Sequence, residues 1–216
     1  MLICDEFEIQ RRAMVANQLR SHGRNIDHSG VLQAMDRTPR HEFVPLREQA
    51  RAYADYPLPI GYGQTISQPY IVAFMTAALD PHPGDRVLEI GAGSGYQAAV
   101  LSQLVSQVYT VEIVAELAAQ AAATLRRLGY ANVQVRCGDG ALGWPEEAPF
   151  DAILVACAPR RIPAQLTNQL TPTGRMIVPV GSPDRQDLVL LRNTPHGLRR
   201  AAILPVSFVP MTGAAV

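Results

Sequence analysis

Residues 86–96 read Arg-Val-Leu-Glu-Ile-Gly-Ala-Gly-Ser-Gly-Tyr, and this stretch decides the fold. Its apolar first part predicts a buried β-strand over Arg86–Ile90. The glycines that follow, Gly91, Gly93 and Gly95, predict a tight turn into a helix. Glycines at this place let the backbone approach a ligand at the carboxyl edge of a parallel sheet. The stretch therefore predicts a nucleotide-type cofactor site after the first strand of an α/β fold.

Strands and helices alternate on the C-terminal side of this stretch. Apolar runs predict strands over Arg86–Ile90, Val108–Glu112, Val133–Arg136, Phe150–Ala156, Gly174–Val180, Asp187–Leu191 and Ala202–Val206. Helical patterns lie between the earlier strands, over Tyr96–Val105, Val114–Leu128 and Pro163–Leu170. This alternation predicts an α/β fold with a doubly wound, mostly parallel sheet. The last two strands have no helix between them, which predicts an antiparallel hairpin at one edge.

The N-terminal side is less regular. Residues from about 8 to 50 show helical periodicity, and Asp27 or Ser29 is the predicted cap of the second helix. The segment Tyr53–Tyr70 contains prolines and glycines at short intervals. These breakers predict an irregular apolar loop with no regular element.

Length and composition narrow the class of protein. A chain of 216 residues has the size of one domain, so we expect a single domain, with an N-terminal helical segment over about 1–80 and a core over about 81–216. Its 19 basic and 19 acidic residues balance, which gives no electrostatic reason to expect a nucleic-acid partner. All of the basic residues are arginines. The absence of lysine excludes a Walker-type phosphate site, a Schiff base and a kinase strand lysine.

Cysteine and histidine usage indicates a chain without structural disulfides or metals. Cys4, Cys137 and Cys157 lie far apart and form no Cys-x-x-Cys pair, so reduced thiols in the cytoplasm are expected. The five histidines are scattered, and no cluster with His, Asp or Glu has metal-ligand spacing. No signal-peptide pattern and no membrane-length apolar stretch occur, so no membrane association is expected. No exposed heptad indicates an oligomer, and a monomer is the expected state.

The glycine motif points to a cationic cofactor. Its spacing is Gly-x-Gly-x-Gly, which differs from the Gly-x-Gly-x-x-Gly of dinucleotide sites. An acidic residue, Glu89, stands two positions before Gly91. A carboxylate there would repel a pyrophosphate but would attract a sulfonium and an ammonium group. The motif therefore favours S-adenosylmethionine over NAD.

Two further acids follow the next two strands and complete the predicted cofactor site. Glu112 ends the second strand, where a carboxylate can accept both hydroxyls of a ribose. Asp139 follows the third strand and can accept a hydrogen bond from an adenine amino group. Read singly, Glu112 could be a surface acid, and Gly-Asp-Gly could be a simple turn. The predicted cofactor-binding set is Glu89, Gly91, Gly93, Gly95, Glu112, Asp139 and Gly140.

The segment after the fourth strand excludes two kinds of acceptor. It reads Ala156-Cys157-Ala158-Pro159, without the Asn/Asp-Pro-Pro-aromatic pattern of enzymes that methylate amino groups of bases. Enzymes that attack a pyrimidine ring through cysteine place proline before that cysteine, and here alanine precedes Cys157. A cysteine at a buried strand end is usually a small apolar residue. The sequence therefore predicts no nucleic-acid acceptor.

Four stretches carry a family resemblance: Arg51–Tyr70, Glu89–Leu101, Gly138–Pro145 and Phe208–Thr212. On these stretches, and over about Met14–Thr212, the chain resembles the bacterial form of the protein-L-isoaspartate O-methyltransferase family. The glycine motif is shared by many methyltransferases. The run Gly-Gln-Thr-Ile-Ser-Gln-Pro at Gly63–Pro69 is close to unique to this family.

The resemblance implies a Rossmann-like fold and a specific reaction. The reaction transfers a methyl group from S-adenosyl-L-methionine to the α-carboxylate of an L-isoaspartyl residue in a damaged peptide or protein. It leaves S-adenosyl-L-homocysteine and needs no metal. The ester then closes to a succinimide, which reopens partly to normal aspartate. Isoaspartyl peptides and proteins are thus the implied partners, with the helical segment covering the bound substrate.

The resemblance also implies the acceptor site. Ser67 is the implied catalytic residue, and Thr65 and Ile66 lie beside it. Thr212, near the end of the chain, is implied in the substrate pocket. An alternative or additional role for Ser67 is to cap the helix that begins near Pro69.

Two departures and two alternatives accompany this interpretation. The family usually has Thr-Ala-Ala-Pro where this chain has Ala156–Pro159, which alters a minor hydroxyl contact. In the family, a basic residue commonly follows the acidic residue that ends the second strand. In this chain that acidic residue is Glu112, and Ile113 and Val114 follow it. One alternative function is methylation of a small-molecule carboxylate. The other is a binding module that has kept the fold and lost catalysis.

Overall fold

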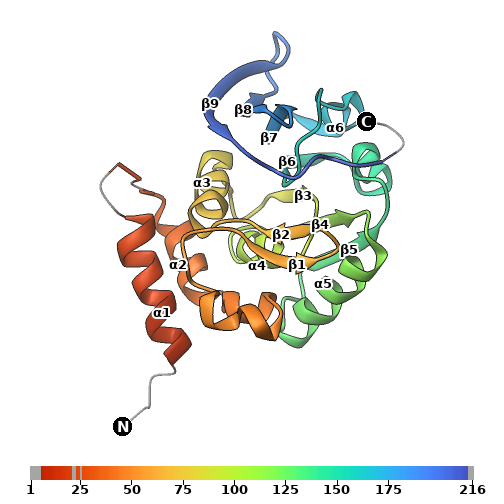
Figure 1. Cartoon of the computed structure of the whole chain (residues 1–216). Helices are drawn as coiled ribbons and strands as arrows, with labels where there is room; N and C mark the ends of the chain where they lie inside the picture. Colours follow the sequence, from red (N-terminus) through yellow and green to blue (C-terminus); the bar gives the residue numbers. More distant parts are fainter. Residues whose placement is uncertain (1–5, 21–22, 25, 214–216) are drawn as a thin grey trace.

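A seven-stranded sheet forms the centre of the computed structural model, which describes residues 6–20, 23–24 and 26–213. Its strand order is β5-β4-β3-β6-β7-β8-β9 (Figure 1). The neighbours from β5 to β7 pair in parallel, and β8 and β9 continue the sheet in antiparallel fashion. The strands are β3 (Arg86–Ile90), β4 (Gln107–Glu112), β5 (Val133–Cys137), β6 (Phe150–Val155), β7 (Leu170–Ser182), β8 (Arg185–Arg192) and β9 (Arg199–Val206). The predicted doubly wound sheet with an antiparallel edge is confirmed.

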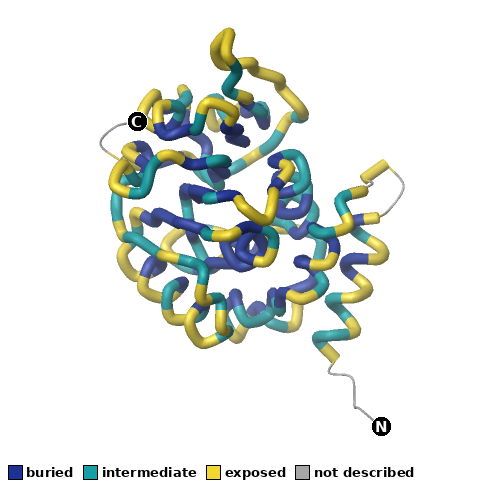
Figure 2. Tube along the Cα trace, turned by 180° about the vertical axis from the view of Figure 1, so that it is seen from behind, coloured by how far each residue is buried: buried dark blue, intermediate teal, exposed yellow. Residues whose placement is uncertain are grey.

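Alternation along the strands divides the core into two layers. On β3, Val87 belongs to the larger apolar cluster and Leu88 to the smaller one. Because successive side chains point to opposite faces, each cluster lies on one face of the sheet. The larger cluster contains side chains of α3 (Pro69–Leu79), α4 (Tyr96–Ser102) and α5 (Ala115–Arg127), and the smaller one contains Leu166 of α6 (Ala164–Asn168). Figure 2 shows the buried trace in the interior and the exposed trace around it.

The N-terminal helices pack on the larger cluster. They are α1 (Glu6–Met14), the π-helical turn η1 (Val15–Leu19) and α2 (Ser29–Arg37), followed by the 3₁₀ turns η2 (Arg40–Phe43) and η3 (Leu46–Arg51). The predicted cap of α2 was wrong. Because His28 directly precedes the first helical residue in an extended conformation, its Nδ1 accepts the hydrogen bond from the Val31 amide at 3.2 Å.

The segment predicted to be an irregular loop contains a small hairpin. Strands β1 (Leu58–Gly61) and β2 (Gln64–Ile66) pair antiparallel, separately from the main sheet. The turn between them needs left-handed backbone at Tyr62 (φ 54°) and Gly63 (φ 70°). The glycine that suggested a break therefore closes a hairpin, which is the physical reason for the error.

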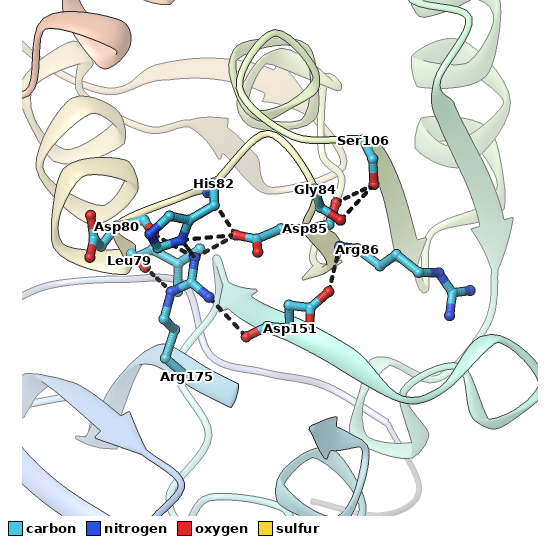
Figure 3. Close-up of polar contacts among 9 residues, drawn as sticks. All are labelled: Leu79, Asp80, His82, Gly84, Asp85, Arg86, Ser106, Asp151 and Arg175. Carbon is cyan, nitrogen blue, oxygen red and sulfur yellow. Dashed lines mark hydrogen bonds and ion pairs between the residues drawn. The ribbon is translucent and has the colours of Figure 1, made fainter. Parts of the chain in front are cut away.

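Helix α3 is anchored at its C-terminal end by a buried arginine. Arg175 of β7 donates hydrogen bonds to the carbonyl oxygens of Leu79 and Asp80, where the helix ends (Figure 3). The same guanidinium pairs with the carboxylate of Asp85. A helix end leaves carbonyl oxygens without intrahelical partners, and the guanidinium supplies them with donors. Because α3 begins at Pro69, this contact holds the far end of the helix that follows Ser67.

Candidate active site

A cavity of about 790 Å³, its open mouth included, lies where the parallel strands end at their carboxyl edge. The strand order reverses between β3 and β6, and α/β sheets bind ligands at such a point. Most of the predicted site residues line this cavity: Thr65, Ile66, Ser67, Gly91, Gly93, Glu112, Gly140 and Thr212. The fold therefore gathers segments from the hairpin, from three strand ends and from the C-terminal part of the chain.

The glycine motif forms the floor of the cavity with left-handed backbone. Gly91 has φ 91°, and its amide donates to the Val111 carbonyl at 2.8 Å. A Cβ on Gly91 would lie 3.7 Å from the Ala156 side chain, so the ends of β3 and β6 come close together here. Gly95 is placed differently, because it precedes α4 and packs against Leu125 of α5. Gly95 does not line the cavity, and its close contact with Leu125 lets α4 and α5 pack together.

Glu112 lines the cavity and holds the glycine loop. One of its carboxylate oxygens accepts from the Gly93 amide at 2.8 Å, and the other accepts from the Val114 amide at 3.0 Å. The side chain is buried at the end of β4. A carboxylate has about four lone-pair sites, so these two bonds leave acceptor capacity for ligand hydroxyls.

Glu89 is buried behind the glycine loop. Within the part of the chain that the structure describes, neither carboxylate oxygen has a hydrogen-bond partner. Burial raises the pKa of Glu89 to about 8; the neighbouring Thr110 hydroxyl opposes this rise, and the charge of Glu112 adds to it. An orphaned acid beside a cavity fits a ligand that brings positive charge, which S-adenosylmethionine does. Glu89 does not itself line the cavity, so it would act on the cofactor through its charge and not through a direct contact.

The pKa of Glu89 makes stability depend on pH. Its carboxyl is protonated below about pH 8 in the folded chain but only below its ordinary pKa of 4.5 in the unfolded chain. The unfolded chain therefore binds fewer protons between these values, and the free energy of unfolding falls as pH rises. Relative to Glu89→Gln, we expect the cofactor-free protein to lose about 3 kcal/mol between pH 5 and pH 8. Denaturant unfolding of both proteins measures this, and a pH-independent difference would contradict it.

Asp139 and Gly140 are placed beyond β5. The Asp139 carboxylate accepts from the Ala141 amide at 2.9 Å and caps the 3₁₀ turn η4 (Gly140–Leu142). Gly140 lines the cavity, but Asp139 does not. A Cβ on Gly140 would lie 2.4 Å from a methyl carbon of Ile90, so this wall requires glycine. The adenine contact of Asp139 therefore stays a prediction.

Ser67 lies where two cavities meet. A second cavity of about 1170 Å³ shares Thr65, Ser67, Ala156 and Val209 with the first. Its other walls come from Pro57, from Gln68 and Ile71 at the start of α3, and from the end of β9 and the segment after it, which includes Phe208. The capping role considered for Ser67 is wrong, because α3 begins at Pro69 with Gln68 as its cap residue and no side-chain cap bond. The position of Ser67 between the cavities is its distinguishing feature.

Several lining residues were missed by sequence reasoning. Val209, Pro210 and Met211 close the cavity from the C-terminal segment, and only the folded chain brings them there. Gln97 also lines it, two residues after the last glycine of the motif. That position is the signal that could have identified it.

Cys157 lines the cavity without being a nucleophile. Burial, with a smaller contribution from the charge of Glu112, raises the pKa of its thiol to about 12. The thiol is therefore protonated at neutral pH, which agrees with the apolar role expected from the sequence. Among the described residues, no group of three or more His, Cys, Asp or Glu side chains is arranged to hold a metal ion.

This sheet order, glycine loop, strand-end carboxylate and orphaned acid define a Rossmann-like methyltransferase that uses S-adenosylmethionine. The sequence profile of the protein-L-isoaspartate(D-aspartate) O-methyltransferase family matches residues 10–215. The chain belongs to this family.

Individual relatives agree with the profile. Proteins named protein-L-isoaspartate O-methyltransferase from Gloeobacter violaceus and Roseiflexus castenholzii are each 54% identical to this chain. The matches cover 92% and 96% of this chain and 97% and 94% of the relatives. These shares leave little of either protein outside the comparison.

Solved structures share the fold. A structure named protein-L-isoaspartate O-methyltransferase superposes with a TM-score of 0.80 at 30% identity, over 97% of this chain and 65% of its own. A structure from Plasmodium falciparum in complex with S-adenosyl-L-homocysteine superposes with a TM-score of 0.80 at 24% identity, over 94% of this chain and 98% of its own.

Proposed function

We infer that this chain transfers the methyl group of S-adenosylmethionine to the α-carboxylate of L-isoaspartyl residues in peptides and proteins. Membership of the family supports this reaction. The observation that carries it furthest is the placement of Ser67 in the wall shared by the two cavities. Methyl transfer needs such a junction, because donor and acceptor must meet in line while occupying separate volumes.

The chemistry asks little of the protein beyond positioning. When bound, the cofactor supplies a methyl group on a positively charged sulfur. A carboxylate acceptor is already ionised at neutral pH, so the chain needs no general base. Opposite charges are neutralised on the way to the transition state, and such a reaction gains from the exclusion of water. Apolar side chains such as Ile66, Val209 and Met211 line the first cavity and would limit the access of water to the reacting groups.

Ser67 is the proposed catalytic residue. Its hydroxyl can donate a hydrogen bond to one carboxylate oxygen and so direct the other oxygen toward the methyl group. We propose that Thr65 and Ile66 hold the acceptor beside it and that Thr212 closes the pocket. All of these side chains lie along the cavity, which supports the assignment.

Cofactor orientation follows from the order of the strands. We propose that the adenine lies at the β5 end near Gly140 and Asp139, and that Glu112 at the end of β4 takes the ribose hydroxyls. Gly91 and Gly93, which follow β3, would then hold the part of the cofactor that carries the sulfonium. The positive charge of the bound sulfonium would favour the ionised form of Glu89, which is buried behind the glycine loop. The β5-β4-β3-β6 order supports this sequence of contacts, because Gly140, Glu112 and Gly91 lie at or just after the ends of neighbouring strands in that order and all line the cavity.

A peptide acceptor suits the second cavity better than a small carboxylate. That cavity is the larger of the two, and exposed Pro57, Pro205 and Ser207 line it, which leaves its rim accessible to a peptide chain. We propose that the segment of about residues 1–80 covers the substrate, since the hairpin and Ser67 belong to it. A non-catalytic binding module is disfavoured because Ser67, Glu112 and Asp139 are all present.

A cytoplasmic location, a monomeric state and the absence of nucleic-acid partners remain predictions. Balanced charge supports the last of these. The free thiols Cys137 and Cys157 are consistent with a reducing compartment. In residues 6–20, 23–24 and 26–213, no helix has the length and apolar character needed to cross a membrane.

Transfer of label from S-adenosylmethionine to matched peptides tests the proposed function. One peptide contains a single L-isoaspartyl residue, and its control contains normal aspartate at the same place. We expect labelling of the isoaspartyl peptide only. Labelling of free small carboxylates, with neither peptide labelled, would establish the alternative acceptor. Tight cofactor binding without transfer to any acceptor would establish the binding module.

A further inference from the structure

Gln97 is a buried amide in the wall of the cofactor cavity. Its side chain belongs to α4 and is 9% exposed. The Nε2 atom donates to the hydroxyl of Thr76 at 2.9 Å, and that hydroxyl donates to the Val72 carbonyl at 2.7 Å. Thr76 is fully buried in α3, so this short chain of hydrogen bonds ties α4 to α3 beside the cavity.

These hydrogen bonds fix which way the amide faces. A threonine hydroxyl has one proton, and here that proton goes to Val72. The hydroxyl can therefore only accept from Gln97, which requires the amide nitrogen to face Thr76 and leaves Oε1 on the other side. Among the described residues, the bond to Thr76 is the one hydrogen bond that the Gln97 side chain makes, so Oε1 has no protein donor. An acceptor oriented in this way, on a residue that lines a cavity, is prepared for a ligand donor.

Its position in the sheet order indicates which part of the ligand it meets. Gly140 and Glu112 mark the nucleoside side of the cavity, at the ends of β5 and β4. Gln97 follows β3, on the opposite side of Glu112 from β5, and contacts the helix that begins after Ser67. The amino-acid end of S-adenosylmethionine must extend beyond the ribose and sulfur, away from β5. Its ammonium is a donor, as Oε1 requires.

We propose that Gln97 binds the amino-acid end of the cofactor through Oε1, with Thr76 as the residue that positions its amide. The proposal rests on the cofactor assigned under the proposed function and is independent of the acceptor. Glu89 is buried, and its carboxyl ionises only when a nearby positive charge favours the charged form, whereas Gln97 adds a directional hydrogen bond at the cavity surface. Because the bond is to a charged donor, its loss should weaken binding roughly 10-fold or more.

Two ligands separate this role from a general structural one. S-adenosylhomocysteine carries the amino-acid end, whereas 5′-methylthioadenosine has the same nucleoside and thioether without it. Calorimetric titration of the full chain should show that Gln97→Met lowers the affinity for S-adenosylhomocysteine roughly 10-fold or more. The affinity for 5′-methylthioadenosine should stay unchanged. Methionine matches glutamine in length, and an unfolding curve for each variant checks that the wall is intact.

Thr76 offers a matched pair of variants. Thr76→Val removes the hydroxyl at constant shape, so the Gln97 amide can turn, and the affinity for S-adenosylhomocysteine should fall by a few-fold. Thr76→Ser keeps the hydroxyl and should bind S-adenosylhomocysteine as the parent protein does. Equal losses for both ligands in Gln97→Met, or no loss for either, would overturn the proposal. If the parent protein does not bind S-adenosylhomocysteine, both the assignment of the cofactor and this proposal are overturned. Binding without transfer to isoaspartyl peptides would affect only the proposed acceptor.

Discussion

Ser67→Ala is expected to lower turnover of an isoaspartyl peptide roughly 10- to 100-fold while the affinity for S-adenosylmethionine stays nearly unchanged. Ser67 lies in the wall shared by the two cavities, and we propose that the acceptor carboxylate binds beside it. Removing its hydroxyl leaves the carboxylate free to rotate, so fewer bound substrates are aligned with the methyl group. The folded chain loses no helix cap, because Ser67 does not cap α3.

Steady-state rates with saturating cofactor, together with a cofactor titration, measure the two effects of Ser67→Ala separately. Thr167→Ala is a suitable control, because its hydroxyl is exposed and bonds only to Ala164 in the short helix α6. That control should behave as the parent protein. A loss of cofactor affinity as large as the loss of turnover would remove Ser67 from the acceptor site.

Glu112→Ala is expected to have the opposite signature. It removes the proposed ribose acceptor and the two hydrogen bonds that hold the Gly93 and Val114 amides. We expect S-adenosylhomocysteine binding to weaken by about 1–3 kcal/mol, which is the range for a lost charge-assisted hydrogen bond. Turnover at saturating cofactor should change much less, since Glu112 does not line the second cavity, where we propose that the peptide binds.

The matched control is Glu116→Ala, which removes the same side chain from an exposed position in the first turn of α5. Calorimetric titration of the two variants under the same conditions compares them directly. Glu116→Ala should bind the cofactor as the parent protein does. An unchanged affinity in Glu112→Ala would exclude Glu112 from the cofactor site.

The centre of the main sheet could be predicted because β3, β4 and β6 are buried on both faces. Such strands are continuous apolar runs, and the observed bounds of β3 are the predicted Arg86–Ile90. The antiparallel edge followed from the missing helix before the last strand. Strand β9 was predicted too short, since its first three residues, Arg199, Arg200 and Ala201, are exposed at the edge of the sheet and form no apolar run. An exposed edge strand lacks the apolar run that marks a buried one.

Errors on the N-terminal side have local physical causes. His28 caps α2 through a ring nitrogen, and histidine is not among the residues whose side chains usually fill that position. The β1–β2 hairpin is held by buried Leu58, Ile60 and Ile66, while its glycines serve the turn. Breakers and turn residues are the same residue types, so composition alone did not separate a loop from a hairpin.

The cofactor site was more predictable than the acceptor site. Gly91, Gly93 and Glu112 lie directly at strand ends, and parallel strands bring their carboxyl ends to one edge. Val209, Met211 and Thr212 reach the cavity only through the path of the C-terminal segment, which no local pattern determines. Thr212 was identified through the family resemblance, and the junction of the two cavities at Ser67 became visible only in three dimensions.

The reaction and its acceptor are tested most directly by following one isoaspartyl peptide over time with the protein and S-adenosylmethionine. Chromatography and mass spectrometry should show a peptide that gains one methyl group, then a succinimide that has lost the methyl group as methanol, and then a rising share of the normal aspartyl peptide. Formation of each species should require the cofactor and should be slower with the Ser67→Ala variant. Persistence of the isoaspartyl peptide without a methylated form, while the cofactor binds, would contradict the assignment of this acceptor.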